Sequence, residues 1–567
     1  MILKGKSAAP GFVTGSIYIY NKNFIIPVES FISAEDSRLH HERYLSVKEQ
    51  AWKELDRIRL SMEKVDPIRA GIFRAHQEIV DDITINEEIP ARILNDLWAG
   101  DWAIYHVYET VLSILRQTAD SLIAERVSDF DDVRAMLLKL WYGQKDKGLS
   151  SEINALKDPV IIAAYDLKPS DTASLDRTKV LAILSETGGI TSHTAIIAKS
   201  FGIPTVLGIE GLLEHVKQGQ RAAINAGEGM VILDPEDHVT AEFLCKSTTF
   251  SRDKEEIESF RYKQCCTSCG EKIDIGVNIS NDDELDEIQY ADMVGLFRTE
   301  FLFMKNNSLP TEEEQSLSYK KVLECFKEKP VVLRLLDIGA DKQISYLDMR
   351  HEENPFLGNR GIRFCFNNLD IFRTQIRAAL RASFYGNLWL MIPMVSSLDD
   401  IRRAKNIITE EKDELKNKGI GYGDFKTGIM IEVPSIALIA DLAVKEVDFA
   451  SIGSNDLCQY LCAADRMNNL VESYYQNYHP AVFRLIKEIV YAFNEAGKPV
   501  SLCGELGNDP LVAPVLIGLG LRKLSMGAAS IAAVKRSIAS VTLTKQMADN
   551  VLQLQTAEEI EKFLKPS

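Results

Sequence analysis

The amino-acid sequence predicts an α/β protein: a C-terminal (β/α)8 TIM-type barrel, preceded by a smaller α/β domain that contains an inserted helical domain. Three observations support this fold class. Short apolar runs recur through the second half of the chain, and helical stretches separate most of them. Helical periodicity with many charges fills residues 33–144, and β-rich runs lie before and after it. The chain has 567 residues, which is long enough for two to four domains.

The α/β domain is predicted from residues 1–32 and 145–234. Short strand patterns with Gly and Pro turns begin the chain, and strand patterns return at residues 159–164 and continue to 230–233. Between these parts, the run from Glu42 to Leu60 has apolar residues at three- and four-residue spacing, which indicates an amphipathic helix. We therefore predict that residues 33–144 form the inserted helical domain.

A polar, helix-prone stretch over residues 235–264 predicts a linker helix, and the barrel pattern fills residues 265–567. Eight β units separated by helices within about 300 residues are typical of a (β/α)8 barrel. The predicted strands lie at Ile273–Val277, Met293–Phe297, Val331–Leu335, near Gly361–Arg363, and at Leu388–Ile392, Gly428–Ile431, Phe449–Ile452 and Pro499–Leu502.

The segment Gly188–Ala195 contains a histidine that can carry a phosphoryl group. It follows the apolar run Val180–Leu184 and leads into a helix-like stretch. Its glycines allow a tight turn, and its small hydroxyl residues can cap a helix. His193 would then lie at a helix N-terminus, where free N–H groups and the helix dipole favour an anion. A helix cap beside a buried histidine has the same local pattern, so this segment alone leaves both interpretations open.

Composition narrows the class of protein. The formal net charge of −17 and the pI near 5.2 argue against a nucleic-acid or anionic-membrane partner, and fit an acidic surface that meets a basic protein. No charge-free apolar stretch reaches the length of a membrane span, and the N-terminus lacks the apolar core of a signal peptide. Nine unevenly placed cysteines indicate reduced cytosolic thiols, since the single CxxC at Cys266 and Cys269 has no second pair at zinc-site spacing. We therefore predict a cytoplasmic protein.

Polar residues follow the predicted barrel strands closely. In a barrel, these positions open onto the C-terminal mouth, where active sites form. Isolated salt bridges at strand ends would explain one or two of them but not the whole set. The residues are Arg298, Arg334, Asp337, Glu432, Asn455, Asp456, Cys503 and Gly504.

Several motifs, in this order, resemble those of phosphoenolpyruvate-protein phosphotransferases, the enzyme I family of the bacterial sugar phosphotransferase system. The resemblance runs almost from end to end of the chain. The motifs are Ala9-Pro10-Gly11, the Gly-Gly-x-Thr-Ser-His-Thr string around His193, Arg298–Phe303, Asp337-Ile338-Gly339, Asn354–Gly358, Ser454–Leu457 and Cys503–Leu506.

The resemblance implies an activity, a cofactor and partners. Phosphoenolpyruvate would phosphorylate His193 and leave as pyruvate, and the phosphoryl group would pass to the histidine phosphocarrier protein HPr, as the first step of the phosphotransferase system. The α/β domain would be the swivelling phosphohistidine domain and the helical insert the carrier-docking domain. The barrel would bind phosphoenolpyruvate with Mg²⁺ and form a homodimer.

The resemblance also implies the role of each site residue. Arg298, Arg334 and Arg466 would contact the phosphate, with Asn455 and Arg360 helping at the substrate, because guanidinium groups bind anions with paired hydrogen bonds. Glu432 and Asp456 are hard oxygen ligands suited to Mg²⁺. Cys503 would protonate C3 of enolpyruvate, with Gly504 beside it in the family's CGEL motif, although an inert buried thiol is the usual role of a lone cysteine. Thr172 would orient the ring of His193.

Some residues depart from the family pattern. Ile190 replaces the usual Arg or Lys before the Thr-Ser-His string, which removes a cation beside the phosphohistidine. Arg74 stands where an acidic residue is usual, close to His76, which we interpret as a docking or surface residue rather than a phosphorylation site. Asn359 replaces a common Trp near the barrel mouth.

Three other kinds of protein share part of this pattern. A dikinase or synthase would need a Gly-rich, lysine-containing ATP loop before the histidine, and the sequence has none. A nitrogen-branch paralogue would carry an additional N-terminal sensory domain. A phosphorylatable regulator with little turnover would not need Cys503, the two metal ligands and the arginines together, and only Ile190 favours it.

Overall fold

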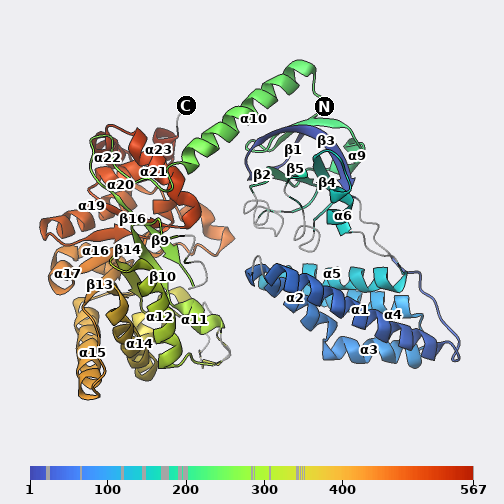
Figure 1. Ribbon diagram of the computed structural model, residues 1–567, viewed down its shortest axis with the longest axis horizontal. Helices are drawn as coiled ribbons and strands as arrows, with labels where there is room; N and C mark the ends of the chain where they lie inside the picture. The colour runs from blue at the N-terminus through green and yellow to red at the C-terminus, as the bar shows by residue number, and fades with distance from the viewer. Residues whose placement is uncertain are drawn as a thin grey trace. The chain divides into compact units, whose positions relative to one another are not determined.

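The computed structural model describes residues 1–20, 26–63, 67–116, 121–143, 148–167, 176, 178–188, 195, 202–281, 285, 288–305, 308–339, 344, 346–347, 349 and 352–565. His193, Thr172 and Ile190 lie outside the described residues. The chain divides into two compact units, Met1–Asp253 and Lys254–Ser567 (Figure 1). Within the described part of the chain, no helix has both the length and the apolar character needed to cross a membrane.

The first unit contains an eight-stranded sheet with the order β1-β8-β7-β3-β4-β5-β6-β2. Strands β3 to β6 pair in parallel, while β1 with β8, β8 with β7, β7 with β3, and β2 with β6 pair antiparallel. The strands are β1 (Ile2–Lys4), β2 (Lys6–Ala9), β3 (Phe12–Tyr20), β4 (Val160–Ala164), β5 (Val180–Ser185), β6 (Thr205–Leu207), β7 (Arg221–Asn225) and β8 (Met230–Leu233).

The central strands of this sheet are buried on both faces. In β4, Ile161 and Ala163 belong to one apolar cluster, while Ile162 and Ala164 belong to another. Successive side chains of a strand point to opposite faces, so a continuous apolar run is expected where both faces are covered. The short helix α6 (Gly148–Asn154) belongs to the second cluster, and α9 (Leu212–His215) belongs to the first.

Of the six described helices between β3 and β4 in the chain, the first five have a core of their own. They are α1 (Ser37–Glu63), α2 (Pro67–Val80), α3 (Ile83–Leu94), α4 (Gly100–Arg116) and α5 (Ser121–Trp141). On α1, Tyr44, Val47, Ala51 and Leu55 recur at three- and four-residue spacing and are all buried in this core. The apolar face predicted for this helix is therefore the face that packs.

His76 is part of this helical core, and its predicted place at the surface is wrong. Its side chain is 2% exposed, with Nε2 3.2 Å from Asp129 Oδ1 and the ring edge-on to Phe73. Asp129 on α5 is the hydrogen-bond partner that allows this polar ring to be buried, and the sequence of α2 alone does not reveal that partner. Arg74, two residues before it, is exposed and lies 3.8 Å from Glu78 Oε1.

Helix α10 (Asp237–Glu258) leads into the second unit, which is a closed barrel of eight parallel strands. The strands are β9 (Asp274–Ile279), β10 (Met293–Arg298), β11 (Val331–Arg334), β12 (Leu388–Ile392), β13 (Phe425–Ile431), β14 (Phe449–Ile452), β15 (Val500–Leu502) and β16 (Lys523–Met526). The helices after them are α11 (Glu300–Lys305), α12 (Glu312–Phe326), α13 (Ile362–Asn367), α14 (Leu369–Ala382), α15 (Leu398–Asn417), α16 (Pro434–Leu438), α17 (Ala440–Glu446), α18 (Ser454–Cys462), α19 (Pro480–Glu495), α20 (Ala513–Gly518), α21 (Ile531–Ser540), α22 (Thr544–Gln553) and α23 (Ala557–Leu564).

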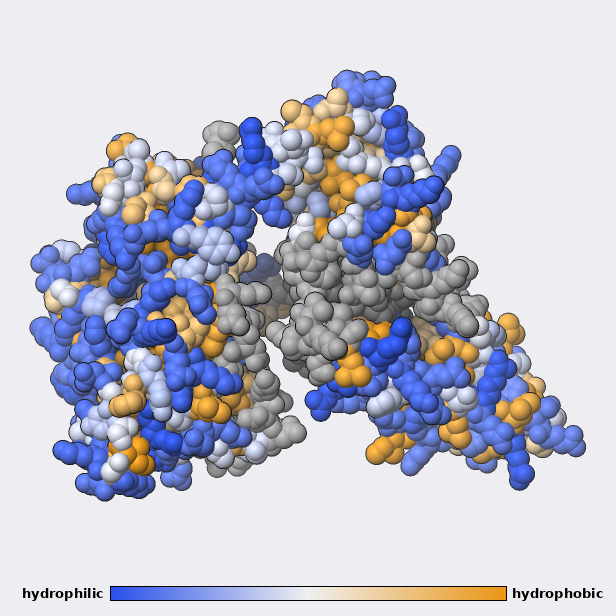
Figure 2. All heavy atoms as spheres, viewed as in Figure 1, coloured by the Kyte–Doolittle hydropathy of each residue, from blue (hydrophilic) through white to orange (hydrophobic). Residues whose placement is uncertain are grey.

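The barrel strands separate two apolar clusters. In β12, Leu388, Leu390 and Ile392 belong to the large cluster shared with the surrounding helices, while Trp389 and Met391 belong to a small cluster. Trp389 and Met391 pack with residues of β10, β11, β13 and β14, as expected of side chains that fill a barrel interior. The face of the barrel unit that Figure 2 shows is largely hydrophilic, with apolar side chains scattered over it.

The fold class is confirmed, but one predicted strand is wrong. Residues Gly361–Arg363 do not form a strand, because Gly361 has φ of +58° and α13 begins at Ile362. A Cβ at Gly361 would lie 2.7 Å from the Cβ of Met394, so the turn requires glycine. The eighth strand is β16, whose sequence Lys-Leu-Ser-Met alternates polar and apolar residues and so contains no run of consecutive apolar residues.

Candidate active site at the carboxyl ends of the barrel strands

Most residues predicted for the barrel site lie at one end of the closed barrel. Arg298 and Arg334 are the last residues of β10 and β11, while Glu432 and Cys503 directly follow β13 and β15. Asn455 and Asp456 lie in the first turn of α18, immediately after β14. Because all eight strands are parallel, these positions meet at the C-terminal mouth.

Arg360 links two carboxylates at this mouth. Its Nε and Nη2 atoms donate to Asp337 Oδ1 and Oδ2 at 3.1 and 3.0 Å, and its Nη1 atom donates to Asp456 Oδ1 at 3.0 Å. The side chain is 4% exposed, and Tyr460 Oη accepts a further bond from Nη1 at 3.3 Å. A guanidinium with partners on three sides is a fixed cation, which a lysine could not replace.

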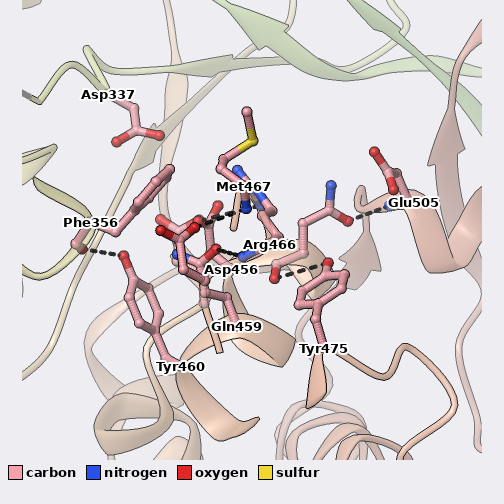
Figure 3. Close-up of polar contacts among 12 residues, drawn as sticks. Asp337, Phe356, Asp456, Gln459, Tyr460, Arg466, Met467, Tyr475 and Glu505 are labelled. Atoms are coloured by element: carbon pink, nitrogen blue, oxygen red, sulfur yellow. Dashed lines mark hydrogen bonds and ion pairs between the residues drawn. The ribbon is translucent and has the colours of Figure 1, made fainter. Parts of the chain in front are cut away.

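Two further arginines have unused donors. Arg334 donates to Glu300 and lies 3.0 Å from Asp337 Oδ2, yet its buried Nε atom has no hydrogen-bond partner among the described residues. Arg466 Nη1 lies 3.6 Å from Asp456 Oδ1 and also has no hydrogen-bond partner in the part of the chain that the structure describes (Figure 3). Buried donors of this kind are normally satisfied, so these atoms are suited to an incoming anion.

Arg298 has the most available guanidinium of the set. It is half-buried, and within the described ranges its side chain makes no hydrogen bond or ion pair. Its charge is close enough to Cys503 to favour the thiolate of that residue.

Glu432 is a carboxylate with one unused oxygen. The side chain is fully buried, and Oε1 accepts the backbone N–H of Met394 at 2.7 Å. Oε2 has no hydrogen-bond partner in the described structure. Burial, together with the charges of Asp456 and Asp337, raises the pKa of Glu432 to about 8. A bound cation would relieve both the missing contact and the repulsion between these carboxylates.

Glu432 and Asp456 are therefore the pair that fits a divalent metal. Across the described residues, no group of three or more His, Cys, Asp or Glu side chains could hold an ion alone. A metal bound by these two carboxylates would take its remaining ligands from substrate and water, as Mg²⁺ sites that act on phosphates usually do.

Cys503 is buried at the base of the mouth. Its side chain is 3% exposed, and Sγ donates to Ile452 O at 3.6 Å. Asn278 Nδ2 donates to the carbonyl oxygen of Cys503 at 3.0 Å, which fixes its backbone. Burial raises the pKa of the Cys503 thiol, although a hydrogen bond from Ser451 and the charge of Arg334 oppose this rise. The thiol is thus protonated near neutral pH, yet its thiolate has nearby stabilising groups.

Asn455, in the first turn of α18, and Gly504 connect the ends of β14 and β15. The backbone N–H of Glu505 donates to Asn455 Oδ1 at 2.7 Å, and Tyr475 Oη donates to Asn455 O at 3.4 Å (Figure 3). A Cβ at Gly504 would lie 2.0 Å from Ser454 Oγ, so only glycine fits there. Asn455 and Gly504 thus position the loop that contains Cys503.

Sequence reasoning missed three residues that hold the arginines. Glu300 pairs with Arg334, Tyr460 contacts Arg360, and Gln459 Oε1 accepts the backbone N–H of Arg466 at 3.1 Å. Glu300 lies inside the Arg298–Phe303 motif, and Tyr460 follows Asp456 by four residues on α18. That spacing puts the two side chains on one helix face, so the sequence could have predicted that Tyr460 lies close to Asp456.

The predicted phosphoryl acceptor lies outside the described residues, and so does Thr172. The residues on both sides of His193 that the structure describes are placed in the sheet domain. Strand β5 ends at Ser185, and Ala195 is buried against Ala8 and Leu207.

Comparisons with known proteins agree over the whole chain. Three family models match: "PEP-utilising enzyme, N-terminal" at residues 4–126, "PEP-utilising enzyme, mobile domain" at 156–229, and "PEP-utilising enzyme, PEP-binding domain" at 254–543.

Relatives called phosphoenolpyruvate-protein phosphotransferase are similar over nearly their full lengths. The protein of Staphylococcus carnosus is 38% identical, over 98% of this chain and 97% of its own. That of Geobacillus stearothermophilus is 39% identical, over 91% and 90%. That of Enterococcus faecalis is 37% identical, over 99% and 98%. The chain belongs to the phosphoenolpyruvate-protein phosphotransferase family.

Proposed function

We propose that the barrel binds phosphoenolpyruvate, that its phosphoryl group passes to His193 with release of pyruvate, and that the acceptor protein is HPr. The protein is a phosphoenolpyruvate-dependent phosphotransferase of the sugar phosphotransferase system. One observation supports the proposed site: three arginines and two carboxylates lie at one mouth of the barrel, and among the described residues Arg334 Nε, Arg466 Nη1 and Glu432 Oε2 have no hydrogen-bond partner.

The arginines supply substrate binding. Arg298, Arg334 and Arg466 would take the phosphate, because each has donors that no described residue uses. Arg360 is fully engaged by Asp337, Asp456 and Tyr460, so its role is to fix Asp456 and to add positive charge. The substrate is thereby oriented with its enol carbon toward Cys503.

Glu432 and Asp456 would hold the divalent metal, which we propose to be Mg²⁺. When bound, it would neutralise charge on the phosphoryl group and the departing enolate. Side chains of the protein carry out the remaining steps. The bond between phosphorus and the enol oxygen breaks as an imidazole nitrogen of His193 attacks phosphorus. Cys503 then gives its proton to C3, and pyruvate forms.

The protonation of Cys503 suits this role. Burial keeps the thiol protonated before the reaction, while Ser451, Arg334 and Arg298 favour the thiolate that remains afterwards. A general acid must hold its proton before the reaction and be stable as the anion after it, and the surroundings of this thiol favour both.

The remaining assignments rest on the resemblance and the positions of the motifs. We propose residues 1–32 and 145–234 as the phosphohistidine domain, with Thr172 orienting His193. Residues 33–144 would dock the carrier, residues 235–264 would link the two units, and residues 265–567 would form the barrel and the homodimer. One histidine must serve both the barrel and the carrier, so the phosphohistidine domain must move between them. The protein would act in the cytoplasm.

The test follows the phosphoryl group. Purified protein is incubated with phosphoenolpyruvate and Mg²⁺, pyruvate is measured, and HPr is then added. We expect pyruvate in an amount close to that of the enzyme before HPr is added, and continued pyruvate release afterwards, with acid-labile phosphate on HPr. Pyruvate release without any phosphoprotein would contradict the proposal.

A further inference from the structure

Two cysteines that have no role in the proposed reaction lie one turn apart on α18. Cys458 is buried, and Cys462 is half-buried and is the last residue of the helix. Their four-residue spacing puts both side chains on one face of the helix. Cys458 Sγ donates its hydrogen to Gln476 O at 3.3 Å. All nine cysteines of the chain are free thiols, so this pair is a reduced dithiol.

The turn between these cysteines carries the residues that position two arginines. Gln459 Oε1 accepts the backbone N–H of Arg466 at 3.1 Å. Tyr460 Oη accepts from Arg360 Nη1 at 3.3 Å and donates to Phe356 O at 2.5 Å (Figure 3). A change in the shape of this turn therefore moves the partners of Arg360 and Arg466 together.

Closing a disulfide here requires such a change. Residues four apart on a helix have Cβ atoms about 5–6 Å apart, whereas a disulfide needs about 3.5–4.5 Å. The helix ends at Cys462, and Ala463 has φ of +51°, so only the last turn must tighten. A strained bond of this kind is easily reduced again.

We propose that Cys458 and Cys462 are a reversible oxidation site for hydroperoxides, and that their disulfide weakens substrate binding by displacing the partners of Arg360 and Arg466. This inference rests on the proposed function, because it assigns regulation to the same barrel site. A transient disulfide also fits a chain whose cysteines are otherwise reduced.

The chemistry balances with hydrogen peroxide as oxidant. The sulfur of Cys462 attacks one peroxide oxygen, the O–O bond breaks, and the departing hydroxide leaves as water, with a sulfenic acid on Cys462. The sulfur of Cys458 then attacks the sulfur of Cys462, the S–O bond breaks, and a second water leaves with the proton of Cys458. Both thiols are oxidised and one peroxide is reduced to two waters.

Cys462 is the better first nucleophile. It is the more exposed thiol of the two. The neighbouring Cys458 side chain, the backbone of Gln476 and the charge of His479 together lower the pKa of Cys462 to about 6, against the effect of burial. More of it is therefore thiolate at neutral pH.

The sequence allows a direct test of the bond. Trypsin releases both cysteines in one peptide, Glu446–Arg466, which contains no other cysteine. We expect peroxide treatment to lower the mass of this peptide by two hydrogens, and dithiothreitol to restore it. If peroxide inactivates the protein without forming this bridged peptide, the inference is wrong.

The second measurement is substrate affinity of the full chain by calorimetry with phosphoenolpyruvate and Mg²⁺. We expect oxidation to raise Kd by on the order of tenfold in the native protein, and to leave Cys462→Ser unchanged. Cys269→Ser is the matched control, because that thiol is exposed and lies outside α18, and it should respond as the native protein does. Equal loss of affinity in Cys462→Ser would overturn the inference. A reduced native protein that makes no pyruvate would instead contradict the proposed function, while the peptide mass would still test the dithiol.

Discussion

Arg360 Nη1 donates a hydrogen bond to Asp456 Oδ1 at 3.0 Å, although the two residues are 96 positions apart in the chain. The contact joins the loop after β11 to the helix after β14, across the mouth of the barrel. Because the same guanidinium also binds both oxygens of Asp337, it pairs with two buried carboxylates at once.

Removing this arginine should destabilise the barrel. In Arg360→Met, Asp337 and Asp456 lose their shared cation, and breaking a buried ion pair typically costs about 3–5 kcal/mol. We expect a loss of this size in the barrel's urea unfolding transition, together with weaker binding of phosphoenolpyruvate. Arg363→Met is the control, because among the described residues Arg363 donates to the carbonyls of Leu357 and Gly358 and to no carboxylate, so its loss should cost far less. Equal losses in both variants would show that the two carboxylates do not depend on Arg360.

His193→Ala should abolish phosphoryl uptake but leave substrate binding intact, because the binding residues lie on the barrel. The measurement is radiolabelled phosphoenolpyruvate, with protein-bound phosphate counted after filtration and affinity determined by calorimetry. His238→Ala serves as the control, since that side chain is exposed and should label normally. Acid-labile, base-stable phosphate on His193→Ala would show that another residue is the phosphoryl acceptor.

Cys503→Ala should bind phosphoenolpyruvate and metal normally but release pyruvate more slowly, by on the order of 10²–10⁴. Its proton is needed at carbon, a step separate from phosphoryl transfer to nitrogen. Stopped-flow detection of pyruvate in a single turnover would measure the rate. Serine should not restore it, because a hydroxyl is far less acidic than a thiol.

Cys365→Ala is a matched control for this prediction. Both thiols are buried, and each donates to a backbone carbonyl at 3.6 Å, Ile452 O for Cys503 and Leu336 O for Cys365. Both variants lose similar packing, so only the loss of the proton donor should separate them. Full activity in Cys503→Ala would show that this thiol only packs in the barrel and is not the proton donor.

Gly504→Ala should displace the loop that contains Cys503. The added methyl group would lie 2.0 Å from Ser454 Oγ and 2.7 Å from Ser454 N, which forces β15 and α18 apart. Overpacking of this kind costs about 1–3 kcal/mol, and we expect kcat to fall more than KM rises. Gly527→Ala, after β16, has nothing within 4 Å of its Cβ and should change stability by less than about 0.5 kcal/mol. Normal kcat in Gly504→Ala would show that the loop adapts without cost.

The sequence by itself determined the fold class and which polar residues lie at the mouth of the barrel. Seven of the eight predicted β units correspond to barrel strands, because long apolar runs separated by helices are a strong local signal. The polar residues after those runs had to meet at one mouth once the strands were parallel, which is why Arg298, Arg334, Glu432 and Cys503 could be grouped in advance.

Only the tertiary structure decided how these residues are paired. The turn at Gly361 depends on its close approach to Met394, and the burial of His76 depends on Asp129, so neither was visible in the local sequence. The same holds for Oε2 of Glu432, which no described residue contacts by a hydrogen bond, and for the bond from Arg360 to Asp456. Each depends on side chains brought together by strands and helices far apart in the chain, and local patterns contain no information about such partners.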